Sequence, residues 1–281
     1  MAHRFPILTV PLTTFVERRS TSVGRLFFQK ITRSLAYVCQ ISHSKCRKNA
    51  FSVRKNTILF AYIKKMLYLC SVVSNWNILR PLGNVPVSTA VLKSLLIGYS
   101  NPNAKIKLWV EQGFLVPLKR GLYVVSQEVT QQEPCLGLIA NHLYVPSYVS
   151  MQFALRHYGL IPERVMLVTN ITTCHARSFS NSLGSFVYHN VGRAYFALGV
   201  TSTSDGASSY MMATPEKALV DTILFTSKVP NSLVGLQQFL EEDMRFEMDA
   251  LHSMDISLLQ AIAEVAPKQT IIQNLITLCQ R

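Results

Sequence analysis

The sequence has 281 residues, of which 49% are hydrophobic and 15% are charged. A chain of this length has room for about two domains, and its apolar content excludes a protein that is disordered throughout. The formal net charge is +13, but residues 1–65 hold 13 Lys/Arg and one acid, whereas residues 66–281 hold 15 Lys/Arg and 14 acids. The charge of the whole chain therefore does not indicate DNA binding by the main body.

Residues 1–65 form a basic leader that is rich in Ser and Thr and almost free of acids. This composition is typical of an organelle transit peptide and also of a disordered arm that binds nucleic acid. A third interpretation is that the leader lies upstream of a true start at Met66. We favour it because domain patterning begins just after Met66. Prolines interrupt the early apolar run, which argues against a secretory signal, and Lys64 and Lys65 divide the later one into pieces too short to span a membrane.

The six cysteines show neither a CxxC pair nor a regular spacing: Cys39, Cys46, Cys70, Cys135, Cys174 and Cys279. Metal-binding cysteines come in closely spaced pairs, and disulfide frameworks belong mainly to short secreted chains. We therefore expect a cytoplasmic protein that uses no metal and no cofactor.

Residues 66–126 are predicted to form three helices and a hairpin. The first two helices are apolar segments over 66–79 and 87–96. The third runs over 101–112, where Asn101 can cap the first turn, the following proline suits the first helical position and a glycine ends the helix. Two short apolar strands follow within 114–125, and they are joined by Lys119, Arg120 and Gly121.

Three helices followed by a hairpin with a basic tip predict a winged helix-turn-helix. In this fold the third helix enters the major groove of DNA and the hairpin, or wing, lies along the phosphates. The candidate DNA contacts are Asn101, Asn103, Lys105 and Lys107 on the third helix, and Lys119 and Arg120 on the wing. The alternative is a small helical domain whose lysines are merely solvated.

Residues 127–133 are polar without an apolar period and are predicted to be a linker. The second predicted domain, residues 134–281, is α+β with a helical C-terminal tail, so that the whole chain is α+β. Its predicted strands are 164–173, 184–191, 194–202 and 208–213, and its predicted helices follow Pro134 and then cover 150–158, 214–225, 232–244, 255–266 and 268–280.

Two of these helices have marked ends. Ser150 is expected to cap one of them by accepting a hydrogen bond from its first turn, and Gly159 to end it in the left-handed conformation. Thr214 is expected to cap the other, with a proline at the first helical position. On that second helix Lys217 and Asp221 stand four residues apart, which is the spacing of a surface ion pair.

Five segments, in this order, resemble the AbiEi-type antitoxins of bacterial abortive-infection, type IV toxin–antitoxin systems. The segments are "LVPLKRGLYVV", "YVSMQFALRHYGLIPE", "VTNITTCHARSF", "GSFVYHNV" and "ATPEKALVD". The resemblance covers residues 66–225. It implies a winged helix-turn-helix that binds repeats in its own promoter, joined to a C-terminal domain that counters a nucleotidyltransferase-like toxin without forming a stable complex with it.

The candidates for an antitoxin surface are Arg156, Tyr158, Arg177, Glu216 and Lys217. Structural roles explain the last two as well, because an acid suits a helix N-terminus and Lys217 can pair along its helix. The chain lacks GxxxxGK[ST], GxGxxG and HExxH motifs, and we predict no catalysis. The predicted function is an antitoxin that represses its own promoter. The alternatives are a regulator or interaction module without an antitoxin role and a metal-dependent nuclease with scattered carboxylates.

Overall fold

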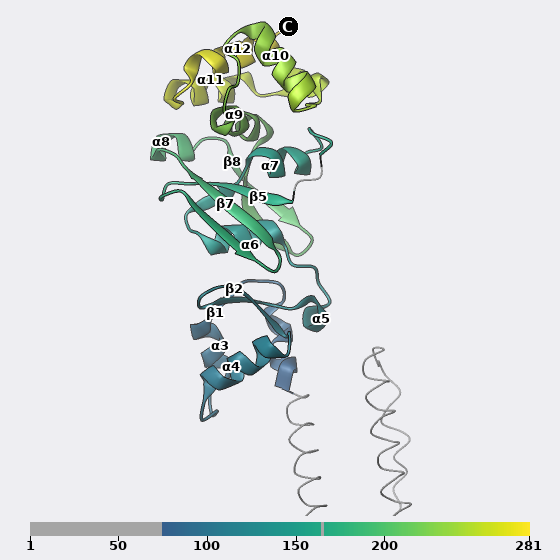
Figure 1. Cartoon of the computed structure of the whole chain (residues 1–281), viewed down its shortest axis with the longest axis vertical. Coiled ribbons are helices and arrows are strands. Elements are labelled where there is room, and N and C mark those ends of the chain that lie inside the picture. Colours follow the sequence, from purple (N-terminus) through teal and green to yellow (C-terminus); the bar gives the residue numbers. More distant parts are fainter. Residues whose placement is uncertain (1–74, 164–165) are drawn as a thin grey trace, which may run out of the picture. The chain divides into compact units, whose positions relative to one another are not determined.

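The computed structural model describes residues 75–163 and 166–281, and these residues form an α+β protein (Figure 1). The leader and most of the helix predicted over 66–79 lie outside the described residues. The described end of that predicted helix forms two short 3₁₀ turns, η1 (Asn75–Ile78) and η2 (Arg80–Leu82).

The N-terminal unit, residues 75–126, combines two helices with a small antiparallel sheet. The helices are α3 (Thr89–Leu95) and α4 (Pro102–Glu111), and the strands are β1 (Val87–Ser88), β2 (Leu115–Lys119) and β3 (Leu122–Val125), in the order β1-β3-β2. Leu92, Ile106 and Trp109 are buried in a core of their own. Gly121 has a φ of 81°, which permits the tight turn between β2 and β3.

The predicted linker contains a helix, α5 (Gln127–Thr130). Val129 is 3% exposed and belongs to the core of the N-terminal unit. A single apolar residue in a polar segment produces no period, which is why the sequence pattern does not predict this helix.

The C-terminal part holds a six-stranded mixed sheet with the order β6-β7-β5-β4-β9-β8. Its strands are β4 (Ser147–Val149), β5 (Leu167–Thr172), β6 (Arg177–Asn181), β7 (Gly184–Asn190), β8 (Val200–Asp205) and β9 (Ser208–Ala213). The pairs β5–β7 and β4–β9 are parallel, and the other pairs are antiparallel.

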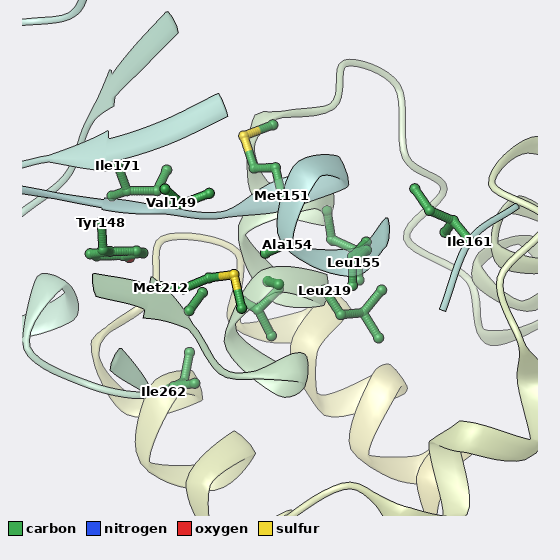
Figure 2. Packing of buried hydrophobic residues seen from close by; sticks show 14 of the residues in the cluster. Tyr148, Val149, Met151, Ala154, Leu155, Ile161, Ile171, Met212, Leu219 and Ile262 are labelled. Carbon is green, nitrogen blue, oxygen red and sulfur yellow. The ribbon is translucent and has the colours of Figure 1, made fainter. Parts of the chain in front are cut away.

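Helices cover both faces of this sheet (Figure 1). On one face lies α6 (Leu136–Leu143), whose Ala140 carbonyl accepts a hydrogen bond of 2.6 Å from the Tyr188 hydroxyl of β7. On the other face lie α7 (Met151–His157) and α9 (Pro215–Phe225), which pack against each other. Figure 2 shows Ala154 and Leu155 of α7 on the side of Leu219 of α9.

The helical tail packs over α9, which lies between the tail and the sheet (Figure 1). The tail contains α10 (Leu233–Gln238), a π turn η3 (Phe239–Asp243), a 3₁₀ turn η4 (Met248–Ser253), α11 (Ile256–Val265) and α12 (Gln269–Cys279). Ile262, Ile272 and Leu275 of the tail are 0% exposed and join the main core. None of the described helices combines the length and the apolar character that a membrane span requires.

One predicted strand is wrong and two strands were not predicted. The segment 194–202 begins inside a short helix, α8 (Arg193–Phe196), and its strand starts only at Val200. Gly199, with a φ of 62°, breaks the chain between them. β4 and β6 are short strands defined by their pairing with β5 and β7, which local alternation does not reveal.

Candidate nucleic-acid interface

The interface predicted from the sequence is built on α4. The Asn101 side chain accepts a hydrogen bond of 3.1 Å from the Ala104 amide, which confirms it as the cap of this helix. Ile106 and Trp109 are buried beneath the helix, whereas Asn103 and Lys107 are exposed. The residue types that can contact DNA therefore lie on the outer face of α4, and Asn101 is already occupied as a cap.

The two lysines of α4 differ in their surroundings. Lys105 is half-buried, and its ammonium lies 5.6 Å from the centre of the Trp109 ring and 6.0 Å from that of Tyr99. Burial lowers the pKa of Lys105. Lys107 is exposed and forms an ion pair of 3.7 Å with Glu111. An exposed pair of this kind contributes only about 0.3–0.5 kcal/mol, so that Lys107 can exchange Glu111 for a phosphate at little cost.

The wing is the hairpin of β2 and β3, and its two basic residues also differ. The Lys119 ammonium donates a hydrogen bond of 2.6 Å to the carbonyl of Leu143, the last residue of α6, and it lies 5.9 Å from the centre of the Phe179 ring. A cation is favoured at a helix C-terminus by the helix dipole. Arg120 is exposed at the tip. Of the two predicted phosphate contacts, only Arg120 is therefore left available by these interactions.

A shallow hollow of about 320 Å³ lies between α4 and the wing. Its walls include Asn103 and Lys107 from α4, Pro117 from β2 and Tyr123 from β3. The exposed polar face of α4 thus borders the hairpin, as the predicted arrangement requires.

Charge is unevenly divided within the described residues. Residues 75–126 hold six Lys/Arg and one acid, a net charge of +5, whereas residues 134–281 hold nine Lys/Arg and 11 acids. The near-neutral total of residues 66–281 therefore hides a basic N-terminal unit. The interpretation that positive charge belongs only to the leader is wrong in this respect.

The motif residues of the C-terminal part meet in a buried polar network centred on Asp221. Its carboxylate accepts hydrogen bonds from Ser150 Oγ (2.5 Å), from the Tyr195 hydroxyl (2.5 Å) and from the Tyr148 hydroxyl (3.2 Å). The Lys217 ammonium lies 3.9 Å from Asp221 Oδ1, and it donates a hydrogen bond of 2.8 Å to the Tyr195 carbonyl. Both charged side chains are 0% exposed.

This network corrects two predictions. Lys217 and Asp221 are paired as their spacing indicates, but the pair is buried and not on the surface, because β4, α8 and the tail cover the face of α9 that carries it. Ser150 stands at the N-cap position of α7, but its hydroxyl makes no capping hydrogen bond and donates to Asp221 instead. The predicted caps Thr214 and Gly159 are confirmed, because Thr214 accepts from the Lys217 amide and Gly159 has a φ of 74°.

Two of the five predicted antitoxin-surface residues are exposed. Arg156 donates to the Pro162 carbonyl, and Arg177 lies over the rings of Tyr144 and Phe179. The other three are engaged inside the protein. Tyr158 donates to the Ala213 carbonyl, Lys217 belongs to the buried network, and the buried Glu216 accepts from the Asp255 amide at 3.2 Å.

Sequence patterns missed Tyr148 and Tyr195 as members of the network. They lie in a short strand and a short helix that were not predicted, and no local spacing links them to Asp221. Within residues 75–163 and 166–281, no group of three or more His, Cys, Asp or Glu side chains is arranged to hold a metal ion. No protein-family model matches the chain, and no curated protein matches it.

Proposed function

We propose that the N-terminal unit is a winged helix-turn-helix that binds double-stranded DNA, and that the chain is a cytoplasmic antitoxin that represses its own promoter. The observation that carries the DNA-binding half is the segregation of charge. A net charge of +5 is concentrated on residues 75–126, where α4 exposes Asn103 and Lys107 beside the hairpin that carries Arg120. Binding to phosphates depends on such basic surfaces.

The proposed contacts divide into two kinds. Asn103 is a residue type that reads adenine through paired hydrogen bonds in the major groove, whereas Lys107 and Arg120 are cations that hold phosphates. Lys105 is held over aromatic rings of its own unit, and it therefore contributes less to base readout than its position in the sequence suggests.

The test uses the full chain and two duplexes, one from the DNA just upstream of its own gene and one with the same bases scrambled. Asn103→Ala is expected to reduce the preference for the upstream duplex by about 1–3 kcal/mol, because one good bidentate base contact is worth that much. The measurement is a competition titration by fluorescence anisotropy. Equal loss of affinity for both duplexes would make Asn103 a phosphate contact and contradict its role in readout.

The antitoxin half rests on the resemblance of the five segments. Ser150 of the second segment and Asp221 of the fifth are joined by a hydrogen bond of 2.5 Å, so that these segments belong to one folded unit. This arrangement leaves Arg156 and Arg177 as the exposed candidates for contact with a cellular target. Co-expression with the neighbouring nucleotidyltransferase-like toxin tests this half, and continued growth arrest in the presence of the full chain would contradict it.

Two alternative functions predict different results in the same assays. A regulator without an antitoxin role would bind the upstream duplex and fail to restore growth. A metal-dependent nuclease would cut the duplex when Mg²⁺ or Mn²⁺ is added.

A further inference from the structure

A hollow of about 290 Å³ opens where the start of α6, the end of α7 and the β8–β9 hairpin meet. Each of these elements contributes part of its wall. The residues that matter for its chemistry are Gly137, Phe153, Arg156, His157, Asp205 and Tyr210. None of them belongs to the DNA interface proposed above, and the inference drawn from them does not rest on it.

Tyr210 is the buried polar group of this hollow. Its side chain is only 5% exposed, and its ring packs so closely on Gly137 that a Cβ added there would lie 2.3 Å from the ring. The Tyr210 hydroxyl makes no hydrogen bond with another residue in the part of the chain that the structure describes, although its residue lines the hollow. Burial raises the pKa of Tyr210 to about 12, so that the hydroxyl remains a donor at neutral pH.

The hollow carries groups that favour a negative charge. Arg156 spends one N–H on the Pro162 carbonyl, which leaves most of its donors unused by that contact. The first turn of α6 also faces this region, and Cys135 at its N-cap position accepts no hydrogen bond from the helix through its side chain. Backbone N–H groups at a helix N-terminus attract anions.

The hollow also carries one negative charge, that of Asp205. Asp205 is exposed at the end of β8, and no ion pair joins it to Arg156 or His157 within the described residues. Opposite charges thus line one hollow without neutralising each other directly. A phosphate dianion would meet the Asp205 carboxylate, and a simple cation would meet the Arg156 guanidinium.

We propose that this hollow binds a small zwitterion of the α-amino-acid class with an apolar side chain. The ligand carboxylate is held by Arg156, by the start of α6 and by the Tyr210 hydroxyl, and its ammonium is held by Asp205. The apolar side chain packs against Phe153. A volume of about 290 Å³ accommodates a single amino acid of this kind, and a ligand that carries both charges satisfies both sides of the hollow at once.

The test uses the full chain with L-phenylalanine as the probe, followed by amide NMR. We expect saturable binding that shifts the Gly137 amide signal. Acetate and phenethylamine each offer one of the two charges, and we expect each to bind at least about tenfold more weakly, because each loses one charge-assisted contact. The absence of saturable L-phenylalanine binding, or acetate binding of equal strength, would overturn the proposal.

Variants at exposed positions locate the probe without disturbing the fold. Asp205→Asn and Arg156→Gln are each expected to weaken L-phenylalanine binding about tenfold, whereas Arg193→Gln, which removes an exposed charge outside the hollow, leaves it unchanged. Tyr210→Phe keeps the ring and removes the donor, and we expect weaker binding there as well. Binding that is unaltered by Asp205→Asn and Arg156→Gln would place the probe elsewhere and contradict the assignment.

Discussion

Lys217 shows how far a residue's surroundings can depart from what its spacing indicates. Its side chain is fully buried, and its ammonium lies 2.9 Å from the centre of the Tyr195 ring as well as beside Asp221. Burial lowers the pKa of Lys217 from 10.5 to about 8, although the charge of Asp221 opposes this shift. Burial also raises the pKa of Asp221, which Lys217 opposes in turn.

This lowered pKa predicts how stability changes with pH. Between about pH 8 and pH 10.5 the unfolded chain keeps the Lys217 proton more firmly than the folded chain, so that raising the pH favours the folded state. Relative to Lys217→Met, the wild type is expected to gain up to about 3 kcal/mol across this window. Urea unfolding of both proteins at the two ends of the window measures the gain. A constant difference in stability would show that Lys217 does not titrate there.

At the scale of elements, Asp221 joins parts of the chain that are far apart in the sequence. Its carboxylate holds Tyr148 of β4, Ser150 at the start of α7 and Tyr195 of α8, while its own backbone belongs to α9. The sheet, one short helix and the helix that supports the tail thus share a single acceptor.

Asp221→Asn is expected to destabilise the protein by about 3–5 kcal/mol. The substitution keeps the size of the side chain but leaves the buried Lys217 ammonium without a counter-charge, which is the costly way to break a buried pair. Asp243→Asn, at an exposed carboxylate of η3, serves as the control and should change stability by no more than about 0.5 kcal/mol. Denaturant unfolding curves measure both. Equal effects of the two substitutions would remove the network from the account.

The elements also show what the sequence can predict. α9, α11 and α12 are long, capped or strongly periodic, and each was predicted close to its observed bounds. β7 was predicted from its alternation of buried and less buried residues. The failures are β4, β6 and α8, which are short and depend on partners distant in the sequence. Local patterns do not contain that information.

The candidate interface was likewise predicted only in part. The sequence places Asn103, Lys107 and Arg120 on a capped helix and a hairpin tip, and the structure finds them exposed there. It does not reveal that Lys119 reaches the end of α6 or that Lys105 lies over Trp109, because both contacts depend on side-chain paths in the folded state.

At the scale of the whole molecule, the account depends on where positive charge can reach DNA. Residues 75–126 carry +5, while residues 134–281 carry two more acids than bases. A formal charge of +13 for the whole chain includes a leader that can add affinity for any duplex. A decisive measurement must therefore compare proteins that differ by one charge each and share the same leader.

That measurement is a salt titration of binding to the upstream duplex by the full chain and by Arg120→Gln, Lys119→Gln and Arg193→Gln. We expect Arg120→Gln to weaken binding and to reduce the salt slope by about 0.9, the value for one lost phosphate contact. Lys119 is held by the Leu143 carbonyl, and Arg193 lies outside the interface, so that both of these variants should keep the slope of the wild type. A slope that is the same in all four proteins would contradict a DNA interface on α4 and the wing.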